Sequence, residues 1–318
     1  MSHKNFGQPS FADAFVKVCS KGGGFLDAIS KTFDWSAFAW LLSKINGETR
    51  GALGYPPLTM FKIVLLQQWY TLSDPAAEEA VRDRLSFRRF CGIPLDAETP
   101  DHSSIWRFRQ TIEKLGLAEK LLAEVNRQLD ARKLIVRKGT LVDATIIAAA
   151  VAPPPYEEGQ VNERDPDAAF TKKNGKSYFG YKALAVDEES GLVRQAEMSS
   201  ADLHDSQKGE KLIQGDEKAF YANKAYDGAT LRQKLKALKI ADRIAFKGER
   251  NKPLVKRQVW FNKTTSRVRC AVERANATMK RWYGMTRVCY LGLSRNDCHL
   301  RFVVCARNMK RAPVLLAA

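Results

Sequence analysis

The chain has 318 residues, 45% of them hydrophobic, and its 52 Lys and Arg against 35 Asp and Glu give a formal net charge of +17. This length suits about two domains of ~150 residues each, and the hydrophobic content excludes a wholly disordered protein. The absence of any run of ~18 apolar residues excludes a membrane-spanning helix. The positive charge favours a polyanionic partner, nucleic acid first, over a basic protein with no such partner.

The first half of the chain has the pattern of a helical domain. Apolar residues recur at helical spacing from Leu58 to Leu72, after Pro56-Pro57, and Ser73-Asp74-Pro75 starts a second helix that runs to about Leu85. A third helix begins after Asp101, whose carboxylate is expected to cap it, and ends at Gly116. The fourth is the amphipathic segment Leu117 to Leu134. We assign residues 1–137 to an all-helical domain for DNA binding or dimerisation.

From Lys138 onward, strands and helices alternate. The expected strands are 140–147, 178–186, 192–198, 219–222 and 244–246, and the expected helices are 205–213, 229–238 and 268–282. Three successive strands followed by helix–strand alternation predict a mixed α/β sheet with helices on its faces. We assign residues 138–318 to this second domain.

Positive charge is concentrated near the C-terminus. From Arg243 to Arg311 there are 18 Lys or Arg against the 3 acids Glu249, Glu273 and Asp297, a difference of +15. This segment is therefore the expected polyanion-binding surface. Trp260, Trp282, Tyr283 and Tyr290 are interspersed with the charges and are either base-stacking or core residues.

The six cysteines are Cys19, Cys91, Cys270, Cys289, Cys298 and Cys305, and no two form a C-x-x-C pair. The polar segment Met1 to Phe11 lacks the apolar core of a signal peptide. These features predict a cytoplasmic protein with reduced thiols. Cys298 and His299 are adjacent, but no second pair has zinc-ligand spacing, so we interpret them as structural.

Two acids stand in surroundings that suggest chemistry. Asp143 interrupts the apolar strand Leu141 to Ile147, where a carboxylate is costly to bury unless it is paired or binds a metal; the alternative is a solvent-facing Asp. Glu273 shares a helical face with Arg269 and Lys280, and the alternative there is an ordinary Arg269–Glu273 ion pair.

His204 and Asp205 open the helix expected at 205–213. Asp205 is either a plain N-cap or a residue that supports the site.

Several short motifs occur in a fixed order along the chain. They are Ser86-Phe87-Arg88-Arg89-Phe90, Pro100 to Arg109, Arg164 to Asp167, Lys172-Lys173, Tyr178 to Lys182, Ala201 to Gln207, Phe220 to Asp227, Val272-Glu273-Arg274, Met279-Lys280-Arg281, Tyr290 to Asn296 and Arg307-Asn308-Met309. The set resembles the insertion-sequence DDE transposases of the insertion-sequence-five group. The resemblance extends from about Tyr55 to Arg311.

The resemblance implies an RNase H-like mixed five-stranded sheet flanked by helices, with a catalytic triad of acids. Asp143 matches the first acid and Glu273 the third, with Arg269 and Lys280 at the family's signature spacing around Glu273 and Ser266 where the family has Tyr. The position of the second acid is Asn223. Three carboxylates are what two-metal phosphoryl transfer requires, and Mg²⁺, with Mn²⁺ as a substitute, suits that role.

Asn223 has three interpretations. It is an engineered inactivating change, which we favour, or a natural decay of a mobile element, or the true second acid is the neighbouring Asp227 or Asp216. The competing functions are accordingly an active transposase, a catalytically inactive DNA-binding protein derived from one, and an RNase H-like nuclease that cuts without joining.

The implied partners are double-stranded DNA, namely the transposon's terminal inverted repeats and target DNA, bound by a homodimer associated with the bacterial nucleoid. Residues 86–114 form either a helix-turn-helix that reads the repeats or a packing and dimerisation element. The candidate DNA contacts are Arg88, Arg89, Arg107, Arg109, Lys172, Lys173, Arg267, Arg269, Lys280 and Arg281.

Overall fold

The computed structural model describes residues 3, 4, 6, 24–45, 53–155, 162–173, 175–187, 190–203, 213–248 and 253–317. The chain divides into two compact units, one formed by Met1–Ala131 with Arg301–Ala318 and the other by Arg132–Leu300. Within the described ranges, none of the helices is both long and apolar enough to span a bilayer.

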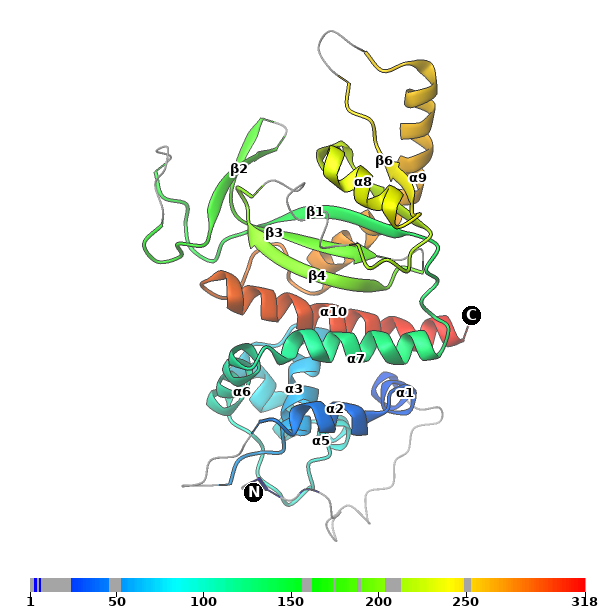
Figure 1. The fold of residues 1–318 in the computed structure, drawn as a ribbon. Helices are drawn as coiled ribbons and strands as arrows, with labels where there is room; N and C mark the ends of the chain where they lie inside the picture. Colours follow the sequence, from blue (N-terminus) through cyan, green and yellow to red (C-terminus); the bar gives the residue numbers. More distant parts are fainter. Residues whose placement is uncertain are drawn as a thin grey trace. The chain divides into compact units, whose positions relative to one another are not determined.

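The first unit is helical. Its helices are α1 (Phe25–Thr32), α2 (Trp35–Leu42), α3 (Pro57–Tyr70), α4 (Asp74–Asp83), α5 (Leu85–Cys91), α6 (His102–Lys114), α7 (Leu117–Ala131) and the later part of α10 (Leu293–Leu316) (Figure 1). Helix α3 is buried along most of its length, because its apolar residues surround the helix instead of forming one stripe. The capping of α6 by Asp101, which accepts a hydrogen bond from the Ser104 amide at 2.7 Å, is confirmed.

The C-terminal residues belong to this helical unit. The Trp69 indole Nε1 donates to the Ala306 carbonyl at 2.8 Å, and the Asn308 amide donates to Asn126 Oδ1 at 3.1 Å. Residues 301–317, which were expected in the second domain, therefore pack with the N-terminal helices. Sequence alone does not reveal this, because α10 continues without a break from one unit into the other.

The second unit contains a mixed sheet. Its elements are β1 (Thr140–Ala148), β2 (Ala169–Lys173), β3 (Lys176–Asp187), β4 (Val193–Ser200), β5 (Ala219–Ala222), the 3-10 helix η4 (Lys224–Tyr226), α8 (Ala229–Ala237), β6 (Ala241–Ile244) and α9 (Lys256–Trp282). Strand β3 pairs antiparallel with β1, β2 and β4, whereas β5 pairs parallel with both β1 and β6. The sheet thus has six strands where five were expected, because β2 lies in a stretch whose polar composition resembles a loop.

Gly180 marks the point where β3 pairs with both β1 and β2. It pairs with Ala148 and with Ala169, and its φ of 152° lies in a region that favours glycine. A Cβ at this position would stand 2.2 Å from the Ile147 carbonyl oxygen. Only glycine lets β3 pass this close to the backbone of β1.

Helices α8 and α9 cover opposite faces of the sheet. Val142 and Phe220 pack with Leu231 and Leu235 of α8, whereas the adjacent Leu141 packs with Ala271 and Val272 of α9. Because side chains alternate along a strand, Asp143 lies on the same face as Leu141, which is the α9 face. The N-terminal part of α9 extends past the sheet (Figure 1).

Two arginines expected to contact DNA instead stabilise the helical unit. Arg88 is only 7% exposed, and its Nη2 donates to the carbonyls of Pro94, Leu95 and Ala97 at 2.5, 3.1 and 2.7 Å. Arg109 donates to both carboxylate oxygens of Asp74. Burial alone would raise the pKa of Asp74, but its bonds to Arg109 hold that pKa below the usual value. The assignment of Arg88 and Arg109 to DNA contacts is corrected to a structural role.

Of the two alternatives for residues 86–114, the helix-turn-helix does not match the spacing of the helices. Helices α5 and α6 are separated by residues 92–101, whereas the motif joins its helices by a turn of about 3–4 residues. The buried Arg88 side chain fills the inside of this connection by binding its carbonyls.

We predict that Arg88→Met lowers the free energy of unfolding by about 2–4 kcal/mol, because three buried carbonyls lose a charged donor. The control is its neighbour Arg89→Met, which breaks a half-exposed ion pair with Asp27 and is expected to cost less than about 1 kcal/mol. Urea denaturation of the two variants measures both values. Equal losses would show that the Arg88 bonds do not hold the connection.

Candidate active site

The site is centred on the Asp143 carboxylate in the middle of β1. Strands β1 and β5 run parallel, with Leu141 beside Tyr221, so the register continued by two residues places Asp143 beside Asn223 at the end of β5. The Asn223 amide Nδ2 donates to Asp143 Oδ1 at 3.3 Å. Two of the three sequence-predicted catalytic positions are thus in hydrogen-bonding contact.

Asn223 presents a donor to the site. Its Oδ1 accepts a hydrogen bond from the Ala225 amide at 2.7 Å and caps η4, which leaves Nδ2 to face Asp143. An aspartate in the same conformation would keep the cap through one oxygen and direct the other at the Asp143 carboxylate. Two like charges at that separation repel each other unless a cation lies between them.

The other two candidates for the second acid, Asp227 and Asp216, pair with arginines and do not contact Asp143 in the described structure. Asp227 Oδ1 accepts from the Arg232 guanidinium at 3.0 Å, and Asp216 is paired with Arg194 and Arg137. Asp216 also precedes β5, whereas Asn223 follows it. The structure therefore brings position 223 to Asp143, and it brings neither of these acids there.

Helix α9 contributes the remaining polar groups. The Arg269 guanidinium lies 3.6 Å from Asp143 Oδ1, although the simpler expectation was an ion pair with Glu273. Glu273 is exposed, and its charge adds to the factors that raise the pKa of Asp143. The Lys280 ammonium donates to the Ile146 carbonyl at 2.7 Å, and its pKa is lowered by burial and by the nearby Lys173.

A cavity of about 210 Å³ opens on Asp143 and Asn223. Its other lining residues are Ile146, Thr171, Lys172, Lys173 and Lys182. Lysines 172 and 173, predicted as DNA contacts, are exposed at the end of β2. Thr171 and Lys182 were not predicted as site residues. The signal for Lys182 was its place in the motif Tyr178 to Lys182, and nothing in the sequence distinguished Thr171.

The side-chain oxygen atoms of the site match the ligand preference of a divalent cation only in part. Asp143 is largely desolvated, and this burial raises its pKa even though Arg269 and Lys173 act in the opposite direction. Carboxylate oxygens of this kind are the ligands that Mg²⁺ prefers. The amide of Asn223 faces Asp143 with its nitrogen, so it does not fit that role. No cluster of three or more His, Cys, Asp or Glu side chains that could hold a metal occurs in the described part of the chain.

The remaining predicted positions lie away from the cavity or outside the described residues. His204 and Asp205 lie outside the described residues. Arg267 and Arg281 are exposed on α9. None of the five cysteines in the described ranges forms a disulfide, and Cys298 and His299 are buried in α10.

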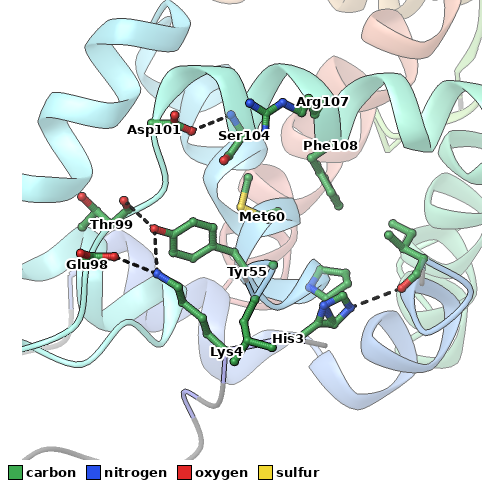
Figure 2. A pocket seen from close by; sticks show the side chains of 14 residues that line it. His3, Lys4, Tyr55, Met60, Glu98, Thr99, Asp101, Ser104, Arg107 and Phe108 are labelled. Atoms are coloured by element: carbon green, nitrogen blue, oxygen red, sulfur yellow. Dashed lines mark hydrogen bonds and ion pairs between the residues drawn. The ribbon is translucent and has the colours of Figure 1, made fainter. Parts of the chain in front are cut away.

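A second cavity, of about 500 Å³, lies in the helical unit (Figure 2). Arg107, one of the predicted DNA contacts, lines it. The charged groups around it are largely paired, because Lys4 Nζ donates to Glu98 at 3.0 Å and Asp101 is engaged in capping α6. The hydrogen bonds from Ser104 and Ser103 lower the pKa of Asp101 to about 2. The two acids that line this cavity, Glu98 and Asp101, are thus engaged in an ion pair and a helix cap.

We predict that Asp143→Asn raises the Tm of the metal-free protein at pH 7.5. Because the pKa of Asp143 is raised in the folded state, its carboxyl contributes most to stability while protonated, and that contribution is lost as pH rises through the folded-state pKa. The amide removes this loss, so the difference between the two proteins should shrink toward pH 4. The exposed Asp96→Asn is the control, and a pH-independent difference would contradict the prediction.

Comparison with known protein families agrees with this geometry. Residues 136–309 match the family described as Transposase DDE domain, and residues 14–111 match the Transposase domain (DUF772). No solved structure matches the chain. Because the first match alone covers more than half of the 318 residues, the chain belongs to the DDE transposases, the DNA-acting enzymes of mobile elements.

Proposed function

We propose that this chain is an insertion-sequence transposase, of the insertion-sequence-five group, whose reaction centre is assembled but silenced by Asn223. It would bind the terminal inverted repeats of its element as a homodimer, and cleave and join DNA in a reaction that depends on Mg²⁺ or Mn²⁺. The observation that carries the proposal is the contact between Asn223 Nδ2 and Asp143 Oδ1, at the position where the family has its second acid.

The strand arrangement supports an RNase H-like core. Three antiparallel neighbours (β1, β3 and β4) are followed by β5 and β6, which lie parallel to β1 with α8 between them in the chain. The order matches the element order that the resemblance implies, with β2 as an addition. In this topology Asp143 lies on β1, Asn223 follows the adjacent strand β5, and Glu273, the proposed third acid, lies on α9.

The residues of the proposed reaction centre would have distinct roles. Asp143 and Glu273 would supply oxygen ligands, and a bound divalent cation would lower the pKa of a water or 3′-hydroxyl nucleophile. Arg269 would hold the Asp143 carboxylate in place. Lys172 and Lys173 would neutralise the phosphates of a DNA end that enters the cavity.

A positively charged rim is needed because the substrate is a polyanion. Lys280 donates to the carbonyl of Ile146, a residue that lines the cavity, so its charge would stay near the reacting phosphate without requiring a flexible side chain. Catalysis of this kind is mainly positioning plus electrostatic stabilisation.

We expect Asn223→Asp to restore cleavage and joining of DNA that carries the element's own ends, by on the order of 100-fold over this chain, as for a restored transition-state charge contact. Strand-transfer assays with Mg²⁺ or Mn²⁺ measure this, with Asn223→Asp/Glu273→Gln as the inactive control. An inert Asn223→Asp protein that still binds the ends would favour the DNA-binding protein without catalysis. Cleavage without joining would favour a nuclease.

The same substitution should change metal binding independently of activity. Asn223→Asp places a second carboxylate against Asp143, so we expect a lower Tm without metal and a clear rise in Tm when Mg²⁺ is added. The unchanged chain should show a much smaller rise. Equal Mg²⁺ responses would mean that position 223 is not a ligand.

A further inference from the structure

Helix α9 carries a row of cations that the reaction centre does not use. Lys256, Lys263, Arg267, Arg274 and Arg281 are separated by seven, four, seven and seven residues, so they share one face of the helix. All five are exposed. We call these five residues the α9 stripe.

No acidic side chain among the described residues forms an ion pair with the α9 stripe. Glu273 is the single acid of α9, and it lies ~100° around the helix from Arg274. Among the ion pairs between described residues, the one that involves α9 joins Arg269 to Asp143, on another face. The five charges of the stripe therefore have no carboxylate partner in the described structure, and a polyanion would supply one.

The geometry of the stripe suits a stiff, regularly charged partner. At ~1.5 Å per residue the stripe is ~37 Å long, which corresponds to about 11 base pairs at ~3.4 Å each. At one end of the helix, Ala271, Val272 and Ala275 are buried. At the other end, Asn262 exchanges hydrogen bonds with the Phe246 backbone at 2.9 and 3.1 Å.

Two aromatic side chains flank the stripe. Trp260 is 68% exposed and Trp282 is 62% exposed, and the Arg281 guanidinium lies 5.2 Å from the Trp282 ring. Exposed tryptophans next to cations give flat apolar surfaces that can rest on sugars or base edges.

We propose that the α9 stripe binds double-stranded DNA along its phosphate backbone, without sequence preference, and holds the duplex across the helix that carries Glu273. A duplex has a persistence length of ~50 nm and stays straight over the stripe, whereas a single strand bends. Phosphate contacts position a duplex but do not read its sequence. The inference rests on the proposed function in that it takes DNA as the partner, and it adds the surface, the form of the DNA and the mode of contact.

The test is the salt dependence of binding by the full chain. Affinity for a random-sequence 30-base-pair duplex is measured by fluorescence anisotropy across a range of KCl concentrations, for this chain and for a variant with all five residues changed to Gln (Lys256, Lys263, Arg267, Arg274, Arg281). Each lost phosphate contact reduces the slope of log K against log salt by ~0.9, so the slope should fall by about 4 to 5.

A matched control removes equal charge elsewhere. Gln at five exposed lysines, Lys31, Lys114, Lys120, Lys218 and Lys236, should leave the slope nearly unchanged. Equal slopes for the stripe and control variants would overturn the proposal, as would a fall seen with single-stranded DNA but not with duplex. If circular dichroism shows that the five-residue variant is misfolded, Arg267→Gln/Arg274→Gln replaces it, with an expected fall of about 2.

The outcome is separable from that of the proposed function, because duplex binding requires no cleavage. A reduced slope together with an inert Asn223→Asp protein would support the stripe and reject the transposition chemistry. An active Asn223→Asp protein together with an unchanged slope would support the transposition chemistry and reject DNA binding by the stripe.

Discussion

The second unit is organised around a carboxylate placed where it is costly to keep one. Asp143 lies within the central strand and is mostly shielded from water, and its polar contacts with other described side chains are a 3.3 Å amide contact and a 3.6 Å guanidinium contact. Burial dominates these interactions and raises the pKa of Asp143. Stability alone would favour an apolar residue there. Parallel pairing of β1 with β5 and packing of α9 on the same face bring the remaining polar groups of the site to this one position.

The parts of the fold that could be predicted are those whose local pattern agrees with their surroundings. The strand at 140–147 and the capped helix after Asp101 have clear periodicity or capping signals, and both form close to the expected limits. Strand β2 was missed because Lys172 and Lys173 make it as polar as a loop, and it is stabilised by pairing with β3 instead of by burial. The N-terminal part of α9 was missed because its exposed face is charged and leaves no apolar stripe.

The roles of side chains were harder to predict than helices and strands, because one residue type can be a buried structural residue at one position and a surface residue at the next. Arg88 and Arg89 are adjacent in the sequence, yet one binds three internal carbonyls and the other lies at the surface with Asp27. Arg269 and Glu273 are one helical turn apart, the spacing of an ordinary ion pair, but the arginine turns to Asp143 because that carboxylate is poorly solvated and the exposed Glu273 is not. Only the three-dimensional surroundings decide between these alternatives.

Asn223 is compatible with the shape that the site has in this structure. The amide caps η4 through its oxygen, as an aspartate would, and its nitrogen satisfies the Asp143 oxygen that would otherwise face a second charge. With a carboxylate at position 223, a bound cation would balance the repulsion between the two carboxylates. With the amide of Asn223 there is no such repulsion, so the folded protein needs no cation at this point. An Asn at this position is therefore compatible with a stable fold, and selection on folding alone would not remove it. The same argument does not apply to the α9 stripe, whose charges have no carboxylate partner among the described residues and slightly destabilise the chain by mutual repulsion. A row of cations that gives no stability to the free protein would be explained by the polyanionic partner proposed for it.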